Sequence, residues 1–187
     1  MYNIGKRKIK IYGVKKLNGH QHEVIGDRIE AFSYLCAAAI TKGKIKIKKI
    51  NPKYLTTELK VLKKIGCNIK VEKSSIELNR KNNLKTTNLK TAPFPGFATD
   101  CMPMLMAVLT KAVGKSKIEE TIFTNRYMAA PELVRMGAKI NIKKSIAFII
   151  GQSNLNGADC ISSDLRSTFA IILGAMVANG ESCISRV

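Results

Sequence analysis

The sequence is poor in aromatic and acidic residues. Tryptophan is absent, aromatic residues make up 6% of the 187 residues, and 13 acidic residues stand against 32 Lys and Arg, so the formal net charge is +19. A field of that sign attracts anionic partners. However, no DNA- or RNA-binding signature accompanies the charge, and few aromatic side chains are available to stack on bases. Because the basic residues are spread along the chain, a general enrichment in lysine explains them better than a nucleic-acid-binding module, which is kept as an alternative.

Long apolar runs and paired cysteines are missing as well. The longest dense apolar stretch covers residues 169–178, whereas a membrane-spanning helix needs about 20 residues. The basic N-terminus has no apolar run behind it, so we expect no signal peptide. The scattered cysteines form no C-x-x-C pair, which argues against a disulfide framework or a zinc site: Cys36, Cys67, Cys101, Cys160 and Cys183. We therefore predict a cytoplasmic protein with buried free cysteines and no membrane partner.

Metal and cofactor sites have little support. His20 and His22 alternate on an expected strand and so point the same way, but no third ligand lies near them in the sequence. There is no glycine-rich phosphate loop of the G-x-x-x-x-G-K type and no Ser-His-Asp arrangement. We predict neither a metal nor a cofactor, in a chain whose 45% apolar content is ordinary for a globular protein.

The sequence does contain an internal repeat. Three segments each begin with aspartate, continue with mostly apolar residues and end with glycine before a short strand: 27–43, 100–114 and 164–180. The aspartate is a good helix N-cap and the glycine suits a left-handed C-cap. A helix that is apolar on nearly every face must be buried all round. The pattern predicts three central helices whose N-termini lie at one end of the domain, where helix dipoles favour anions.

A second element follows the first two copies. It reads LKKIGCNI at 62–69 and LVRMGAKI at 133–140, which indicates the end of an amphipathic helix, a glycine cap and a new strand. Two strand pairs should follow: 69–72 with 75–78, and 140–142 with 146–150. The unit is therefore strand, buried helix, strand, surface helix and two strands.

These units divide the chain into one domain over residues 1–187. Repeat one covers 7–80, repeat two 86–151 and a partial repeat three 154–187, with a polar connector at 81–90. The third copy ends after its first strand, without a surface helix or final strands. Since such a strand leaves ladder groups unpaired, we expect the sequence to be truncated at its C-terminus.

Four stretches, in order along the chain, carry a family resemblance. They read GDRIE at 26–30 with AAAITKG at 37–43, TAPFPGFATD at 91–100, ETIFTNRYM at 120–128 with PELVRMGA at 131–138, and SDLRS at 163–167. Together they resemble the enolpyruvyl transferases that act on UDP-N-acetylglucosamine. The resemblance implies an α/β (α+β) fold, the inside-out α/β barrel domain of this family, with threefold repeats around buried helices. Family members have two such domains, and this chain resembles the one that contains the C-terminal half.

The resemblance also implies a reaction. The enolpyruvyl group of phosphoenolpyruvate is transferred to the 3-hydroxyl of UDP-N-acetylglucosamine by addition and elimination, the first committed step of peptidoglycan synthesis. By resemblance, Asp100 contacts the sugar hydroxyl and acts as base, and Asp164 handles the proton at carbon 3. Arg126 and Arg166 face the phosphoenolpyruvate site, a role that suits the permanently charged, fork-shaped guanidinium.

Two apolar positions complete the implied site. Ile122 contacts the nucleotide and Leu165 the substrate, both through the backbone. The structural alternatives are helix N-caps for the two aspartates, surface ion pairs for the two arginines, and core packing for these two side chains. Asp27 is read as an N-cap, and no role transfers to Arg28.

The missing domain limits what this chain does alone. In the family it carries a phosphoenolpyruvate-binding lysine and a mobile loop with a reactive cysteine or aspartate, for which none of the five cysteines here stands in. Lost positioning removes many orders of magnitude of rate, so we predict that the fragment alone is inactive. Two further alternatives are a transferase acting on shikimate phosphate, disfavoured by NRYM at 125–128 and PEL at 131–133, and a non-catalytic scaffold.

Overall fold

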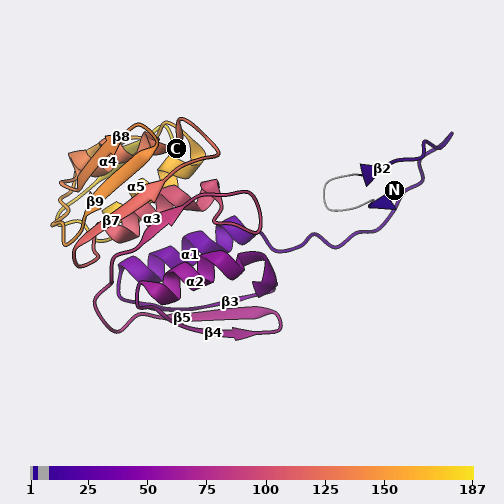
Figure 1. Cartoon of the computed structure of the whole chain (residues 1–187), viewed down its shortest axis with the longest axis horizontal. Helices are drawn as coiled ribbons and strands as arrows, with labels where there is room; N and C mark the ends of the chain where they lie inside the picture. The colour runs from indigo at the N-terminus through magenta and orange to yellow at the C-terminus, as the bar shows by residue number, and fades with distance from the viewer. Residues whose placement is uncertain (1, 4–8) are drawn as a thin grey trace.

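The computed structural model describes residues 2–3 and 9–187. At the N-terminus, β1 (Tyr2–Asn3) pairs with β2 (Ile9–Lys10) in antiparallel fashion, and an extended segment then leads to the first helix (Figure 1). His20 and His22 lie exposed in this segment outside any strand, so the predicted strand there is wrong. The expected start of repeat one at residue 7 lies outside the described residues.

The first helix-and-sheet unit follows residue 27. It comprises α1 (Arg28–Ile40), β3 (Lys44–Lys48), a short 3-10 turn, α2 (Thr56–Lys64), β4 (Asn68–Glu72) and β5 (Ser75–Asn79). The strands form an antiparallel sheet in the order β3-β5-β4. Lysine and isoleucine alternate along β3, so the isoleucines face the helices while the lysines face solvent. Helices α1 and α2 lie side by side over one face of this sheet (Figure 1).

The second unit has the same strand arrangement. Helix α3 (Met102–Leu109), β7 (Lys115–Glu119), α4 (Ala129–Arg135), β8 (Lys139–Lys143) and β9 (Ile146–Ile150) succeed one another. The strand order is β6-β7-β9-β8. The additional strand β6 (Asn88–Lys90) runs parallel to β7. Residues 81–90 were predicted to be a polar connector; this prediction is wrong for Asn88–Lys90, which form β6.

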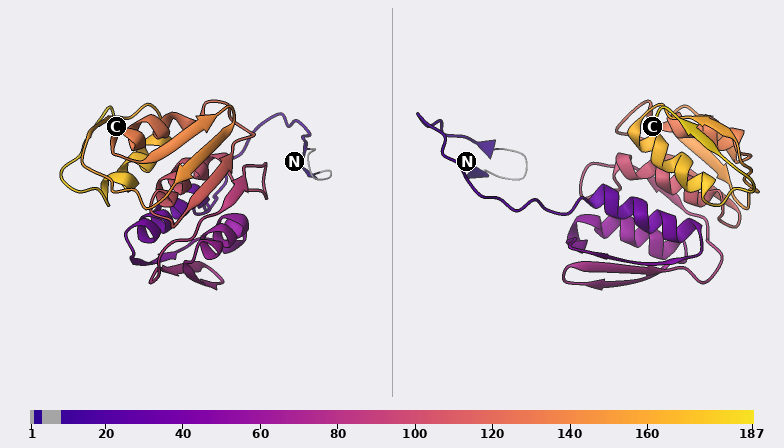
Figure 2. Two further views of the ribbon diagram at one scale, coloured as in Figure 1. Left: turned by 60° about the vertical axis from the view of Figure 1, so that its left-hand side comes forward. Right: turned by 180° about the vertical axis from the view of Figure 1, so that it is seen from behind.

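The described part of the third unit is shorter. Strand β10 (Asp159–Ile161) precedes α5 (Leu165–Ala175), and β11 (Cys183–Ser185) pairs with β10 in parallel. This repeats the relation between β6 and β7 in the second unit. Seen from three sides, the helices α1, α3 and α5 lie inside, with the sheets of the first two units on the outside (Figures 1 and 2).

Helix α3 forms the centre of the core. All eight of its residues are buried, including Met104 and Leu105, because α1, α4, α5 and the strands β7 and β9 all contact it. Helices α1 and α5 are not enclosed in this way: Tyr34 and Ile172 face outward. The predicted burial on all sides is therefore correct for α3 and wrong for the two helices that flank it.

The helix ends follow the sequence signals in part. Asp27 and Asp164 cap α1 and α5 by accepting backbone N–H bonds of 2.7 and 2.8 Å. Gly66 and Gly137 have positive φ directly after α2 and α4, as predicted. Gly43 does not have this role; Lys42 adopts the positive φ instead. At that end the buried Arg80 side chain donates to the carbonyls of Ala39 and Ile40, which satisfies two acceptors left open by the helix.

Four of the predicted buried cysteines are buried, whereas Cys183 is exposed at the start of β11. Within the described part of the chain, no helix combines the length and apolar character needed to cross a membrane. Among the same residues, no three His, Cys, Asp or Glu side chains gather closely enough to hold a metal ion.

Candidate functional site

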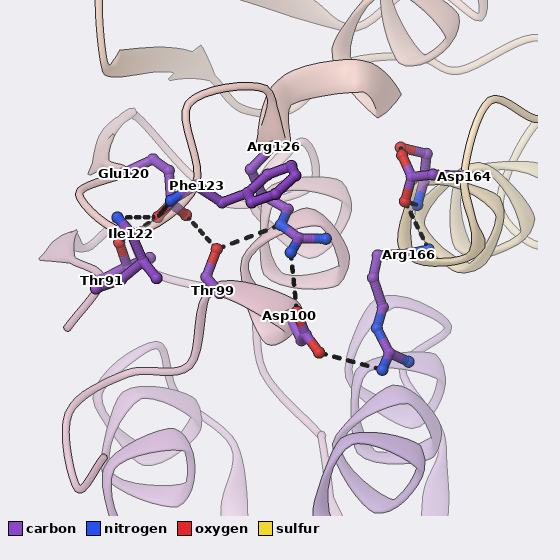
Figure 3. Close-up of polar contacts among 10 residues, drawn as sticks. Thr91, Thr99, Asp100, Glu120, Ile122, Phe123, Arg126, Asp164 and Arg166 are labelled. Carbon is purple, nitrogen blue, oxygen red and sulfur yellow. Dashed lines mark hydrogen bonds and ion pairs between the residues drawn. The ribbon is translucent and has the colours of Figure 1, made fainter. Parts of the chain in front are cut away.

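The candidate site centres on the carboxylate of Asp100. Its Oδ1 lies 3.0 Å from Nη2 of Arg126, and its Oδ2 lies 3.1 Å from Nη2 of Arg166 (Figure 3). Asp100 sits inside a 3-10 turn (Thr99–Cys101) that leads into α3, and the residue at the cap position of that turn is Ala98. The expectation that Asp100 caps a helix is therefore wrong. The extra turn moves its carboxylate away from the first N–H groups of α3, so both oxygens are available to the arginines.

The two arginines come from different units. Arg126 begins the 3-10 turn before α4, and Arg166 lies in the first turn of α5. Both side chains are largely buried, and the Arg126 guanidinium stacks over the Phe123 ring with 4.5 Å to the ring centre. Two permanent cations meet at one carboxylate in a partly buried place, and each has further N–H groups that do not contact it. Such a place suits carboxylate or phosphate groups of a ligand.

Asp164 lies beside this group at the start of α5. It accepts backbone N–H bonds from Arg166 and Ser167, and the Ser167 hydroxyl donates to its other oxygen at 2.5 Å. Burial raises the pKa of Asp164, but these hydrogen bonds and the charge of Arg126 outweigh burial and hold the pKa below its ordinary value. Asp164 is thus a helix cap, as the structural alternative predicted, and also an ionised carboxylate close to the two arginines.

Ile122 and Leu165 are not core residues. Their side chains are 46% and 64% exposed, so the core-packing alternative is wrong for both. Ile122 lies between two hollows. One, of about 310 Å³, is lined by residues 120–124 together with Lys144 and Ser145. The other, of about 220 Å³, is lined by Arg28, Phe94 and Asp100 among others. The position suits contact with a bound molecule.

The helix starts meet as the repeats predict. Arg28, at the start of α1, shares the smaller hollow with Asp100, and Arg166 at the start of α5 contacts Asp100 directly. Arg28 also approaches the buried carboxylate of Glu58 at 3.7 Å and lies over the Phe94 ring. Three units therefore contribute cations to one end of the domain.

Sequence reasoning missed the groups that support this site. Glu58, on α2, accepts the Ala98 N–H at 3.0 Å, and Glu120, after β7, receives four hydrogen bonds. Both carboxylates are buried; Glu120 begins the family-like stretch 120–128, whereas Glu58 lies outside all four stretches. A buried carboxylate is recognisable only when its hydrogen-bond donors are known. Ala98 lies 40 residues from Glu58 in the sequence, and Thr99 lies 21 residues from Glu120.

The fold defines the class of protein. The enolpyruvyl transferase NikO from Streptomyces tendae superimposes with a TM-score of 0.79 at 22% identity, over 87% of this chain and 39% of that one. EPSP synthase from Acinetobacter baumannii gives a TM-score of 0.67 at 17% identity, also over 87% of this chain and 39% of its own. The predicted α/β fold of the enolpyruvyl transferase type is confirmed.

The family follows from sequence comparison. The family model described as EPSP synthase (3-phosphoshikimate 1-carboxyvinyltransferase) matches residues 2–187, and the chain belongs to this family.

Curated relatives of this chain are named UDP-N-acetylglucosamine 1-carboxyvinyltransferase. Those from Zymomonas mobilis, Pelagibacter ubique and Kosmotoga olearia are 46%, 44% and 43% identical over 165, 163 and 164 residues. These matches take in 87–88% of this chain. The chain spans about 39% of the length of these relatives.

Proposed function

We propose that this chain is one domain of an enzyme that transfers the enolpyruvyl group of phosphoenolpyruvate to the 3-hydroxyl of UDP-N-acetylglucosamine, with release of phosphate. The observation that carries the proposal is the Asp100 carboxylate held between Arg126 and Arg166 at the start of the buried helices. Identities of 40–46% with relatives of that name support this acceptor. Such an enzyme acts in peptidoglycan synthesis, and hence in cell-wall formation, cell shape and division.

The residues suit the roles that the chemistry requires. Each oxygen of Asp100 accepts one arginine N–H and has a further lone pair, so a sugar hydroxyl can donate to it without breaking either ion pair. The remaining N–H groups of Arg126 and Arg166 would bind the carboxylate or phosphate of phosphoenolpyruvate. Asp164, ionised at neutral pH, would take or return the proton at carbon 3. Ile122 and Leu165 would line the bound substrates.

We propose that the chain is an incomplete domain of this enzyme. Residues 1–187 would form a single domain with repeat one over 7–80, repeat two over 86–151 and part of repeat three over 154–187. The remainder of the enzyme, including its second domain, would close the cleft, so the chain alone would be inactive. We propose that the enzyme acts in the cytoplasm, where cysteines stay free as they are in this chain. We propose small-molecule substrates and no nucleic-acid or membrane partner, because Arg28, Arg126 and Arg166 lie around Asp100 beside a hollow of about 220 Å³.

The coding DNA on both sides of the sequence tests this organisation. The proposal expects an upstream reading frame with a second set of three repeats, and a downstream continuation with a further arginine-bearing helix. Start and stop signals placed directly at the ends of the 187 residues would contradict it and favour a binding or scaffold role.

A second acceptor has one observation in its favour. The matching family model carries the name of 3-phosphoshikimate 1-carboxyvinyltransferase. The two acceptors differ in chemistry, since one is a sugar nucleotide and the other a phosphorylated cyclic acid. Comparing them as substrates of the complete enzyme separates the two functions.

A further inference from the structure

The carboxylate of Glu120 accepts four hydrogen bonds next to the candidate site. Its side chain follows β7, only 4% of the residue is exposed, and it makes no ion pair within the described chain. Its Oε1 accepts from the backbone N–H groups of Ile122 and Phe123 at 2.7 and 3.1 Å and from the Thr91 hydroxyl at 2.8 Å. A buried carboxylate is costly unless such bonds compensate it, so this environment is built to hold a negative charge.

The other oxygen of Glu120 fixes the direction of one hydroxyl group. Oε2 accepts from Thr99 Oγ1 at 2.9 Å, and the same Thr99 oxygen lies 3.2 Å from Nε of Arg126 (Figure 3). A hydroxyl has one hydrogen to donate and two lone pairs to accept with. Because Glu120 has no hydrogen to give, Thr99 must donate to it, and the lone pairs of Thr99 are then left for the N–H of Arg126.

We propose that Glu120 is a positioning residue that acts through Thr99 to hold the Arg126 guanidinium against Asp100. With Nε bound to Thr99 and the ring of Phe123 on one face, the guanidinium plane is fixed, and its Nη2 reaches Asp100 at 3.0 Å. The effect of this orientation on catalysis rests on the proposed function. The orientation itself follows from hydrogen bonds within this chain. Glu120 touches no substrate in this scheme.

The variant Glu120→Gln reverses the hydrogen bond between residue 120 and Thr99 without changing the shape of the side chain. The amide oxygen must face Ile122, Phe123 and Thr91, because all three donate. The amide NH₂ then faces Thr99 and donates to it. Thr99 Oγ1 then accepts from the amide with one lone pair and from Nε–H of Arg126 with the other, and its hydrogen must turn elsewhere. Thr99 loses the carboxylate that fixed and polarised its hydroxyl, so its bond to Arg126 weakens. Removing the hydroxyl by Thr99→Val abolishes the anchor directly and also removes the path by which Glu120 acts.

A double-mutant cycle tests this mechanism. The variants are Glu120→Gln, Thr99→Val and their combination, with Thr99→Ser as the conservative control. In the 187-residue protein, NMR of the Arg126 Nε–H signal should show protection from solvent exchange in the unmodified chain and in Thr99→Ser. Protection should be reduced in Glu120→Gln and lost in Thr99→Val. A signal that stays protected in Thr99→Val overturns the proposal, even if Glu120→Gln does not fold.

Kinetics of the complete enzyme give the second readout. Glu120→Gln should lower kcat about 100-fold, the size expected when a reacting group is misplaced by about 1 Å. In the Thr99→Val background the same change should leave kcat unaltered, because no hydroxyl is left to transmit it. Equal losses in both backgrounds would show a merely structural role and refute the relay. If the proposed function is wrong, the complete enzyme will show no activity on UDP-N-acetylglucosamine. The NMR result does not depend on that activity and still tests the relay.

Discussion

Arg166 in the first turn of α5 contacts Asp100 in the turn before α3, with 3.1 Å between Nη2 and Oδ2. This ion pair joins the third unit of the chain to the second, across the interface where α3 and α5 pack together. The candidate site therefore depends on how the units pack around α3, and no single unit contains it.

Replacing Arg166 with lysine should separate binding from folding. Lysine keeps the charge but loses the planar fork that grips a carboxylate or phosphate at two points. In the complete enzyme we expect KM for phosphoenolpyruvate to rise about 10-fold, in line with the loss of one charged hydrogen bond worth roughly 1.5 kcal/mol. The matched control is Arg135→Lys, which alters an exposed ion pair with Glu132 on α4. An equal effect of both variants on KM would contradict the assignment.

Asp164→Asn should separate capping from chemistry. Asparagine caps helices about as well as aspartate, so the melting temperature at neutral pH should change little, while loss of the carboxylate should lower kcat by about 100-fold or more. Asp27→Asn is the control, since Asp27 caps α1 in the same way and no part in the reaction is proposed for it. If both variants lower kcat alike, Asp164 is only a cap.

The acid side of the stability curve should report Asp164. Its pKa lies below the ordinary value of 3.8 in the folded chain, so the stability that it contributes is present above that value and is lost as the pH falls through the folded pKa. Melting temperatures of the parent and Asp164→Asn should be similar near pH 5 and should separate toward pH 2, because the parent loses on protonation a contribution that asparagine, which does not titrate, retains. Parallel curves would contradict the prediction.

Tyr127 should be recognisable in alkaline titration. Its buried hydroxyl oxygen lies 3.0 and 2.9 Å from the carbonyl oxygens of Ile118 and Ser145, which share its one hydrogen, and burial raises its pKa from 10.0 to about 12. Its contribution to stability is present below pH 10 and lost as the pH rises toward 12, because the unfolded chain releases this proton first. The absorbance of phenolate should show one late-titrating tyrosine that disappears in Tyr127→Phe. A titration unchanged by that substitution would refute the assignment.

The sequence predicted those features that depend on near neighbours. The caps at Asp27 and Asp164 and the glycines at 66 and 137 follow from contacts within a few residues. Asp100 carries the same N-cap signal, but its partners Arg126 and Arg166 are distant in the chain, and only packing of the units brings them to it. The relay through Glu120 and Thr99 was hidden for the same reason.

Packing geometry also decided which apolar residues became core. The expected burial of α1 and α5 failed on one side of each helix, since only α3 has neighbours in every direction. The backbone N–H of Ile122 is bound by the Glu120 carboxylate, and the Ile122 side chain faces outward between two hollows. Hydrophobic pattern alone does not distinguish an apolar side chain in a core from one in a binding site.

The most direct test of the central claim is phosphate release from phosphoenolpyruvate by the complete enzyme, measured with UDP-N-acetylglucosamine and with 3-phosphoshikimate, before and after Asp100→Asn. We expect saturable release with the sugar nucleotide, little with the shikimate, and a loss of about 100-fold or more in the variant, as is usual on removing a general base. Release that requires 3-phosphoshikimate, or that survives Asp100→Asn unchanged, would contradict it.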